Sequence, residues 1–314
     1  MSEAGKGILA MVAACCIWGL SSLYYKMLAH VPPLEVLSHR TLWSMIFFGA
    51  VLAVQGRLGQ VAELFRKPRV LAIVLLAAVL ISTNWFFFIF SVQTGHAVQA
   101  SLGYYIFPLV AVMLGFVLLG EKLGPAKWAA VGLAAAAVGV LTWGYGVAPW
   151  ISLILAFSFG FYGLLKKGSP AGPVVSVTTE VLLLAPLALI WLWGVHMQGW
   201  QGLVGRNLAT FGHSLKDSLL LMLAGPLTGA PLVLFSYASK RVRLGTVGLV
   251  QYLNPSLQFL VATLIFRETF TRWHAIAFPM IWLALALYSW SSLRQDRAAR
   301  RVAVRVAGEG TTVT

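Results

Sequence analysis

Four ionisable side chains lie inside long apolar stretches of this chain, where a charge is costly to hold. They are Lys26, His39, Arg40 and Glu180. Ionisable groups in such surroundings are functional candidates by default. His39 and Glu180 are the best-placed groups for carrying protons, and imidazole changes its charge near neutral pH. The chemistry that these residues offer is recognition of a charged group and coupling to protons.

Two of these groups also have a structural interpretation. Arg40 either orients an anionic group of a solute or hydrogen-bonds carbonyls at a helix end. Lys26 lies near one end of its apolar stretch, where its stem can carry the ammonium group to water, and Glu35 follows closely enough for a hairpin ion pair. Arg40 and Glu180 differ in depth by on the order of 12 Å, given 1.5 Å per residue, which argues against a direct salt bridge.

Polar and aromatic side chains also recur at helical spacing within the apolar stretches. Ser101, Tyr105 and Pro108 share one helical face, and Gln251, Asn254 and Gln258 share another. Polar faces in lipid should point inward, toward a cavity or a neighbouring helix, and both interpretations stay open. The candidates for lining a solute cavity are Trp18, Ser22, Asn84, Phe88, Ser101, Tyr105, Thr228, Gln251 and Asn254.

Two prolines are candidates for gating elements. Proline cannot donate a backbone hydrogen bond, so Pro108 frees the carbonyl of Tyr104 and Pro255 frees that of Gln251. Each proline therefore predicts a kink near the middle of its helix. The segment 225–231 contains two more prolines, and we expect it to interrupt its own helix.

The composition indicates the environment of these helices. Of the 314 residues, 59% are hydrophobic and only 10% are charged, which is typical of a membrane protein. A helix needs about 20 apolar residues to cross a bilayer. The sequence predicts ten such spans: 8–29, 34–55, 70–92, 97–119, 127–145, 148–165, 174–196, 215–236, 244–266 and 272–293.

The distribution of basic residues predicts the orientation of these spans. With the N-terminus in the cytoplasm, seventeen Lys and Arg residues lie on the inner side and four on the outer side. Both termini are therefore expected in the cytoplasm, with residues 294–314 as a basic tail. The net charge of +14 indicates contact with anionic membrane lipids rather than with nucleic acid.

The chain contains an internal repeat. Pro108 and Glu121 stand 13 residues apart, and Pro255 and Glu268 repeat this spacing 147 residues later. Five spans per copy is an odd number, so the second copy must enter the membrane from the opposite face. The sequence predicts an all-α membrane protein of two inverted five-helix repeats, residues 1–146 and 147–293. Glu121 and Glu268 are expected to be structural, with Lys122 and Arg267 as charge partners.

Motifs for other chemistries are missing from the sequence. The two cysteines, Cys15 and Cys16, are adjacent, and no metal-ligand spacing occurs. The sequence has no HExxH or GxSxG motif and no GxxxxGK[ST] nucleotide loop. We therefore expect no catalytic residues, no cofactor and no metal.

Several runs resemble the RarD family of the drug/metabolite transporter superfamily, whose halves are EamA-type repeats. These runs are Trp18 to Lys26, Glu35 to Trp43 (EVLSHRTLW), Asn84–Trp85, Ala100 to Tyr105 with Pro108, Leu119 to Lys122, Gln251 to Pro255 and Ile281 to Tyr288. The resemblance covers nearly the whole chain. It implies a carrier in the bacterial inner membrane, a central cavity bounded by spans 1, 3, 4, 6, 8 and 9, and a family label of chloramphenicol sensitivity or resistance. Phe107 and Asn254, beside the two prolines, depart from the family pattern.

The sequence thus favours a secondary transporter that moves a small amphiphilic metabolite or drug by alternating access. The alternatives are a receptor or scaffold that binds without transport and, less favoured, a membrane-embedded lipid enzyme. Small residues in the fifth span, Gly132, Ala136 and Gly139, permit close helix contact within the monomer or across a homodimer.

Overall fold

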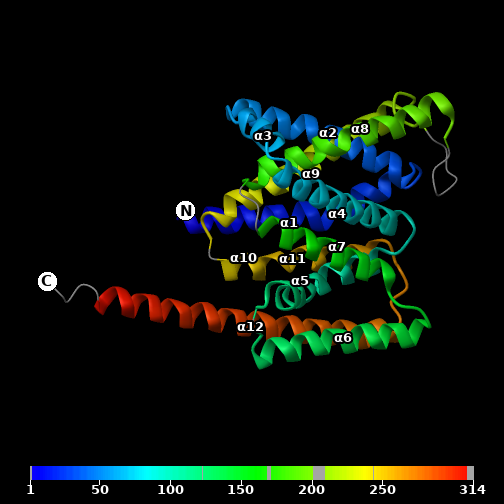
Figure 1. Ribbon diagram of the computed structural model, residues 1–314. Helices are drawn as coiled ribbons and strands as arrows, with labels where there is room; N and C mark the ends of the chain where they lie inside the picture. Colours follow the sequence, from blue (N-terminus) through cyan, green and yellow to red (C-terminus); the bar gives the residue numbers. More distant parts are fainter. Residues whose placement is uncertain (1, 122, 168–170, 201–208, 243, 310–314) are drawn as a thin grey trace.

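The computed structural model describes residues 2–121, 123–167, 171–200, 209–242 and 244–309, and these residues form helices joined by short connections (Figure 1). Lys122, which the sequence offered as a charge partner, lies outside the described residues. The helices are α1 (Glu3–Met27), α2 (Pro33–Val54), α3 (Leu58–Phe65), α4 (Pro68–Gln93), α5 (Ala97–Leu119), α6 (Pro125–Tyr145), α7 (Trp150–Lys167), α8 (Pro173–Gln198), α9 (Leu215–Ser239), α10 (Leu244–Gln251), α11 (Leu253–Leu260), the π-helix η1 (Val261–Ile265) and α12 (Arg272–Glu309).

Helical structure is present at each of the ten predicted spans. Eight helices are long and apolar enough to cross a membrane, and α7 is a shorter apolar helix. The ninth predicted span is divided into α10, α11 and η1, and we call these three elements together the divided span. The all-α membrane fold is confirmed. The short helix α3, which the sequence analysis did not predict, connects α2 to α4.

Proline and glycine set many of the helix ends. Prolines occupy the first helical position of α2, α4, α6 and α8, where the missing N–H costs no hydrogen bond. Gly120, Gly146 and Gly199 follow α5, α6 and α8 with φ near +65°, a backbone conformation that glycine adopts without strain. The spans that were predicted from apolar length begin within two residues of these prolines.

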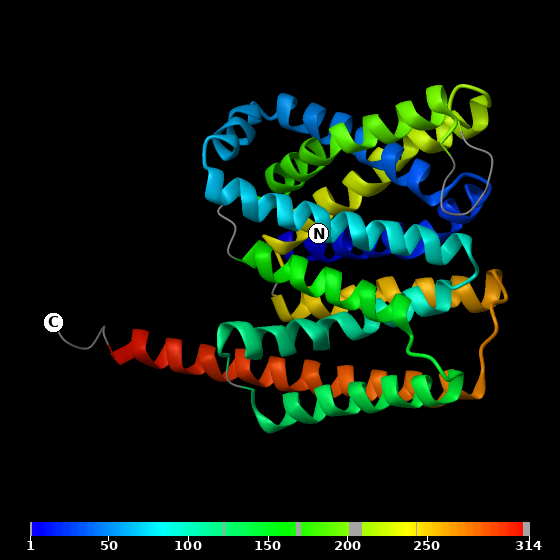
Figure 2. The same ribbon diagram turned by 45° about the vertical axis from the view of Figure 1, so that its right-hand side comes forward.

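The helices form a layered bundle in which segments distant in sequence lie side by side (Figures 1 and 2). α2 packs between α8 and α9, α1 packs against α9 and α11, and α7 packs against α5 and α4. At one edge of the bundle, α6 and α12 pack along each other. The N-terminus and the far end of α12 project from the same end of the bundle in Figure 1, as an even number of spans requires.

Glycines allow the closest helix contacts. A Cβ atom at Gly103 of α5 would lie 2.8 Å from the carbonyl oxygen of Ser152 in α7, and one at Gly225 of α9 would lie 2.3 Å from the carbonyl oxygen of Trp43 in α2. Van der Waals packing of this kind drives helix association in lipid, where no hydrophobic effect operates between helices. Small residues in these spans therefore fix which helices meet.

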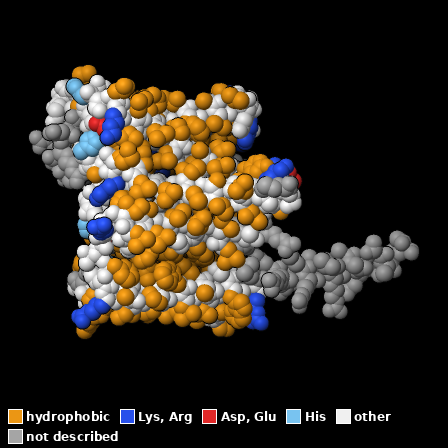
Figure 3. All heavy atoms as spheres, turned by 180° about the vertical axis from the view of Figure 1, so that it is seen from behind, with side chains coloured by type: hydrophobic (Ala, Val, Ile, Leu, Met, Phe, Trp, Pro, Cys, Tyr) orange, Lys and Arg blue, Asp and Glu red, His pale blue; other side chains and the backbone are white. Residues whose placement is uncertain are grey.

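The outer surface carries a hydrophobic band. Figure 3 shows apolar side chains over the middle of the bundle, with Lys and Arg side chains toward its two ends. Exposed leucines, isoleucines and tryptophans occur on most of the long helices, including α6 and α12. This surface suits contact with lipid chains.

One expectation about helix shape needs correction. The segment 225–231 does not interrupt its helix, because α9 continues as one α-helix through Pro226 and Pro231. The hydroxyl of Thr228, between these prolines, donates to the carbonyl of Ala224 within the same helix. The predicted basic tail is compatible with the structure, in which residues 294–309 continue the helix of α12 beyond the apolar part that ends at Ser292.

Candidate functional site

A polar network connects α4, α5 and α7 in the interior. The Asn84 side-chain amide donates to the carbonyl of Leu155 (3.0 Å) and to the hydroxyl of Ser158 (3.1 Å). Its oxygen accepts a hydrogen bond from the Tyr104 hydroxyl at 2.8 Å. Asn84 is almost completely buried, so the network satisfies an amide that would otherwise be costly in the apolar interior.

Aromatic rings connect this network to Arg40. The ring of Phe88 lies edge-on to those of Tyr25 (5.7 Å) and Tyr104 (5.8 Å). The guanidinium carbon of Arg40 lies 4.1 Å from the ring centre of Trp85 and 5.6 Å from that of Tyr25. We call Tyr25, Arg40, Asn84, Trp85, Phe88 and Tyr104 the central cluster.

Arg40 is the charged member of this cluster, and it is 6% exposed. Its Nε atom is buried without a hydrogen-bond partner, and no ion pair joins Arg40 to a carboxylate in the described part of the chain. The rings of Trp85 and Tyr25 stabilise the cation through their faces, but they offer no acceptor to the Nε–H group. Among the described residues, no hydrogen bond joins Arg40 to a helix-end carbonyl, and orientation of an anionic solute group by Arg40 stays a prediction.

Glu180 belongs to a different site, between α7 and α8. One of its oxygens contacts the Lys166 ammonium group at 2.5 Å and accepts from Ser176 at 3.0 Å, while the other accepts from Tyr162 at 3.1 Å. Glu180 is fully buried. The expectation that Arg40 and Glu180 form no salt bridge with each other agrees with these contacts.

The hairpin ion pair between Lys26 and Glu35 was wrongly predicted. The Glu35 carboxylate accepts from the backbone N–H groups of Thr210 (2.9 Å) and Ala209 (3.2 Å), which precede α9. Lys26 is exposed, with its ammonium nitrogen 5.3 Å from the ring centre of Phe266. Lys26 thus lies at the surface rather than in the central cluster.

His39 is adjacent to Arg40 but contacts a different element. Its ring stacks on Phe211 at 4.7 Å, and its Nε2 atom is buried without a hydrogen-bond partner. The ring is only 5% exposed. The position of His39 against the segment before α9 is compatible with a packing role. Proton transfer by His39 stays a prediction.

Glu268 performs a structural role with partners that the sequence did not indicate. Its two carboxylate oxygens accept from the backbone N–H groups of Ala97 and Val98, both at 2.8 Å. These N–H groups begin α5 and have no partner within the helix, and a carboxylate there also interacts favourably with the helix dipole. In the described structure, Arg267 forms no ion pair with Glu268, and this part of the prediction is wrong.

The two prolines that were predicted to act as gating elements have different surroundings. Pro108 lies inside the continuous helix α5. Pro255 follows the boundary between α10 and α11, and α10 ends at Gln251, the residue whose carbonyl the proline frees. The helix is thus divided at Tyr252, before Pro255, and continues through Pro108, while the predicted kinks stay a prediction.

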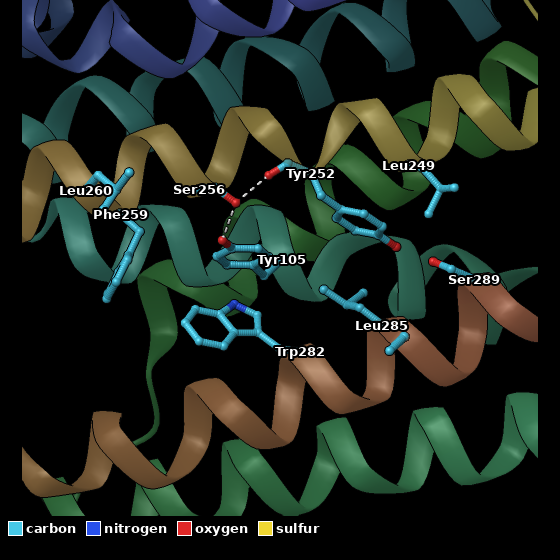
Figure 4. A pocket seen from close by; sticks show the side chains of 10 residues that line it. Tyr105, Leu249, Tyr252, Ser256, Phe259, Leu260, Trp282, Leu285 and Ser289 are labelled. Carbon is cyan, nitrogen blue, oxygen red and sulfur yellow. Dashed lines mark hydrogen bonds between the residues drawn. The ribbon is translucent and has the colours of Figure 1, made fainter.

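Tyr105 lies in a groove on another side of α5 (Figure 4). Its hydroxyl bonds that of Ser256 at 2.7 Å, and Ser256 donates to the carbonyl of Tyr252 at 2.7 Å. The groove has a volume of about 510 Å³ and lies between α5, the divided span and α12, with exposed Leu249 and Leu260 among its lining residues. It therefore opens toward the lipid side of the bundle, in contrast to the predicted central cavity.

The remaining predicted cavity residues bond within their own helices or lie at helix contacts. Ser22, Ser101 and Thr228 are buried, and each donates to a carbonyl of its own helix. Trp18 packs near Phe235, and Asn254 accepts from Gln258. Gln251 ends α10. The structure brings Asn84, Phe88 and Arg40 together and leaves the other predicted residues outside the central cluster.

The comparisons with known proteins agree with this architecture. Residues 5–143 match the EamA-like transporter family. An uncharacterized transporter of Pseudomonas aeruginosa is 40% identical over 92% of this chain and 96% of its own, and the RarD protein of Streptomyces exfoliatus is 41% identical over 95% of this chain and 93% of its own. The chain belongs to the RarD family of EamA-type transporters. A crystal structure of a protein 19% identical in sequence covers 90% of this chain and 96% of its own with a TM-score of 0.58, which shows a shared fold.

Membership of the RarD family makes this chain a multi-pass membrane transporter.

Three members of the central cluster were predicted from the sequence, and Tyr25, Trp85 and Tyr104 were missed. Trp85 was quoted as part of the Asn84–Trp85 run, but its contact with Arg40 joins residues that are distant in sequence. A signal for Tyr104 existed, because the adjacent tyrosines Tyr104 and Tyr105 must point to different sides of a helix.

Proposed function

We propose that this RarD-family chain is a secondary active transporter that moves a small amphiphilic metabolite or drug across the bacterial inner membrane by alternating access. The observation that carries this proposal is the central cluster, in which an unpaired cation and a polar network lie among aromatic rings. Polar and charged groups in the interior of a membrane bundle mark solute pathways in many carriers.

Helix contacts support the proposed inverted repeats, residues 1–146 and 147–293. In the two proposed repeats, α1 corresponds to α7, α4 corresponds to α9, and α5 corresponds to the divided span. The contact of α1 with α9 then corresponds to that of α7 with α4, and the contact of α1 with α11 corresponds to that of α7 with α5.

Two close contacts at glycines show the same correspondence between the α1–α11 pair and the α7–α5 pair. A Cβ atom at Gly19 would meet Leu257, and a Cβ atom at Gly160 would meet Val110. Leu257 and Val110 are 147 residues apart, the same interval that separates Pro255 from Pro108. Such internal symmetry suits alternating access, in which one half rocks against the other around a central site.

Transport is tested with purified protein in proteoliposomes. We expect flux of at least one solute from a panel of amphiphilic amino acids and drugs, measured with and without a pH gradient and compared with protein-free liposomes. Binding without flux of any bound solute would favour the receptor alternative. Turnover of a lipid would favour the enzyme alternative.

The proposed orientation, with both termini in the cytoplasm, is tested by cysteine labelling. In a background with Cys15→Ala and Cys16→Ala, an impermeant maleimide should label Arg57→Cys only from the cytoplasmic side. It should label Thr269→Cys only from the outer side. The opposite pattern would reverse the orientation derived from the basic residues.

A further inference from the structure

The most informative unsatisfied groups in the interior lie on one face of α2. Arg40 and Ser44 are four residues apart, so they share a helical face. Ser44 is fully buried, and both its hydroxyl and the Nε atom of Arg40 lack a hydrogen-bond partner. Arg40 lies seven residues into α2, or about 10 Å at 1.5 Å per residue.

The carboxylates that could neutralise Arg40 are already engaged. Glu35, on the same helix, accepts from two backbone N–H groups before α9. Glu180 is bound by Lys166, Ser176 and Tyr162. A guanidinium group is positively charged in proteins and presents five N–H donors, and burying such a charge without a counter-charge is unfavourable.

We propose that Arg40 and Ser44 bind the carboxylate of the transported solute, which is an organic anion with an apolar, aromatic body. A guanidinium group matches the planar geometry of a carboxylate and can bind it with two parallel hydrogen bonds. The Ser44 hydroxyl supplies a further donor. This inference rests on the proposed transport function and names the class of solute.

The aromatic rings around Arg40 determine which kind of solute can bind there through its carboxylate. Trp85 and Tyr25 flank the guanidinium group, and Phe88 continues the aromatic surface to Tyr104. Flat apolar groups stack on such rings, whereas a small hydrated anion gains nothing from them. Inorganic phosphate or sulfate should therefore bind more weakly than an aromatic carboxylate.

Binding is tested by thermal shift on detergent-purified protein, which needs no transport. The probes are benzoate, phenylacetate and indole-3-acetate, each compared with its methyl ester. We expect at least one carboxylate to raise the melting temperature of the wild-type protein, and its ester to have at least tenfold lower affinity. The comparison of acid and ester uses the wild-type chain alone, so it remains decisive if a variant does not fold.

The variants locate the site. Arg40→Gln should weaken carboxylate binding at least tenfold, and Arg40→Lys should weaken it less because the charge is kept. Ser44→Ala should weaken binding several-fold. The matched control is Thr41→Val, because the Thr41 hydroxyl already bonds the carbonyl of Leu37. Arg57→Gln controls for removal of a cation outside the central cluster.

Three results would overturn the proposal: no carboxylate stabilises the wild-type protein, the esters bind as well as the acids, or Arg40→Gln binds the carboxylate like wild type. The transport proposal has a separate outcome. Carboxylate binding that depends on Arg40, without flux of the same carboxylate in proteoliposomes, would support the anion site and contradict its use in transport.

Discussion

Helix α5 and the divided span carry a proline at matching positions, yet only one of them is interrupted. α5 runs without a break from Ala97 to Leu119, and twelve of its residues are buried. In the divided span, α10 ends at Gln251 and a π-helix follows at Val261–Ile265, and Leu249, Leu260 and Leu264 are exposed. The comparison teaches that a proline weakens a membrane helix, while packing on its neighbours decides whether it breaks.

The largest expected effect tests the packing of α5. Gly103→Leu would place a side chain where a Cβ atom is already 2.8 Å from Ser152 O and 2.9 Å from Leu155 Cβ. Overpacking of this kind costs about 3 kcal/mol, so the melting temperature in detergent should fall sharply. The control is Gly248→Leu in α10, where no atom lies within 4 Å of a Cβ atom. Equal effects of the two variants would show that α5 is no more tightly packed than the divided span.

The second prediction concerns the ion–dipole contact between the start of α5 and Glu268, which follows the divided span. Glu268→Ala removes the carboxylate that accepts from Ala97 and Val98 at the start of α5. Loss of such a cap costs about 1 to 2 kcal/mol. Glu268→Gln should recover part of the stability, since its amide oxygen can still accept one hydrogen bond. Thermal unfolding measures the effect, and unchanged stability in Glu268→Ala would contradict the proposed role.

The third prediction tests gating. Pro255→Ala restores an N–H group that can donate to the carbonyl of Gln251, which would join α10 to α11. If the break allows movement during transport, flux in proteoliposomes should fall by about tenfold, which corresponds to about 1.4 kcal/mol in the barrier. Pro108→Ala is the matched control and should change flux less, because α5 is already continuous. A larger effect at Pro108 would reverse the comparison.

The smallest effect is expected at the direct contact between α5 and α11. Tyr105→Phe removes the hydrogen bond to Ser256, whose length is 2.7 Å. A neutral hydrogen bond contributes about 1 kcal/mol. A double-mutant cycle with Ser256→Ala isolates the pair. Strictly additive losses would show that the two hydroxyl groups do not stabilise each other.

The sequence predicted the helices well because their signals are local. Apolar length, prolines at the first helical position and glycines after the last turn each act within a few residues. One missing N–H group predicted a kink at Pro108 and at Pro255 alike, but it did not show that only the helix at Pro255 is divided. Local signals did not reveal α3 as a separate helix between two spans.

The central cluster was only partly predictable because it depends on contacts between distant residues. Both sides of α5 are buried, so the apolar pattern could not show which of Tyr104 and Tyr105 meets Asn84. The partners of Glu35 lie more than 170 residues away, and those of Glu268 lie about 170 residues away. Nearby basic residues suggested ion pairs, but backbone N–H groups at a helix start and before α9 satisfy these acids instead.

The bond between Glu268 and the first turn of α5 has a mechanical consequence. Separating these two segments would leave the carboxylate and two backbone N–H groups without hydrogen-bond partners. The two segments should therefore move together as one rigid body during any conformational change. The hinge must then lie elsewhere. The interruption at Tyr252 is a suitable pivot, because α10 can swing there while α11 and η1 stay fastened to α5 through Glu268.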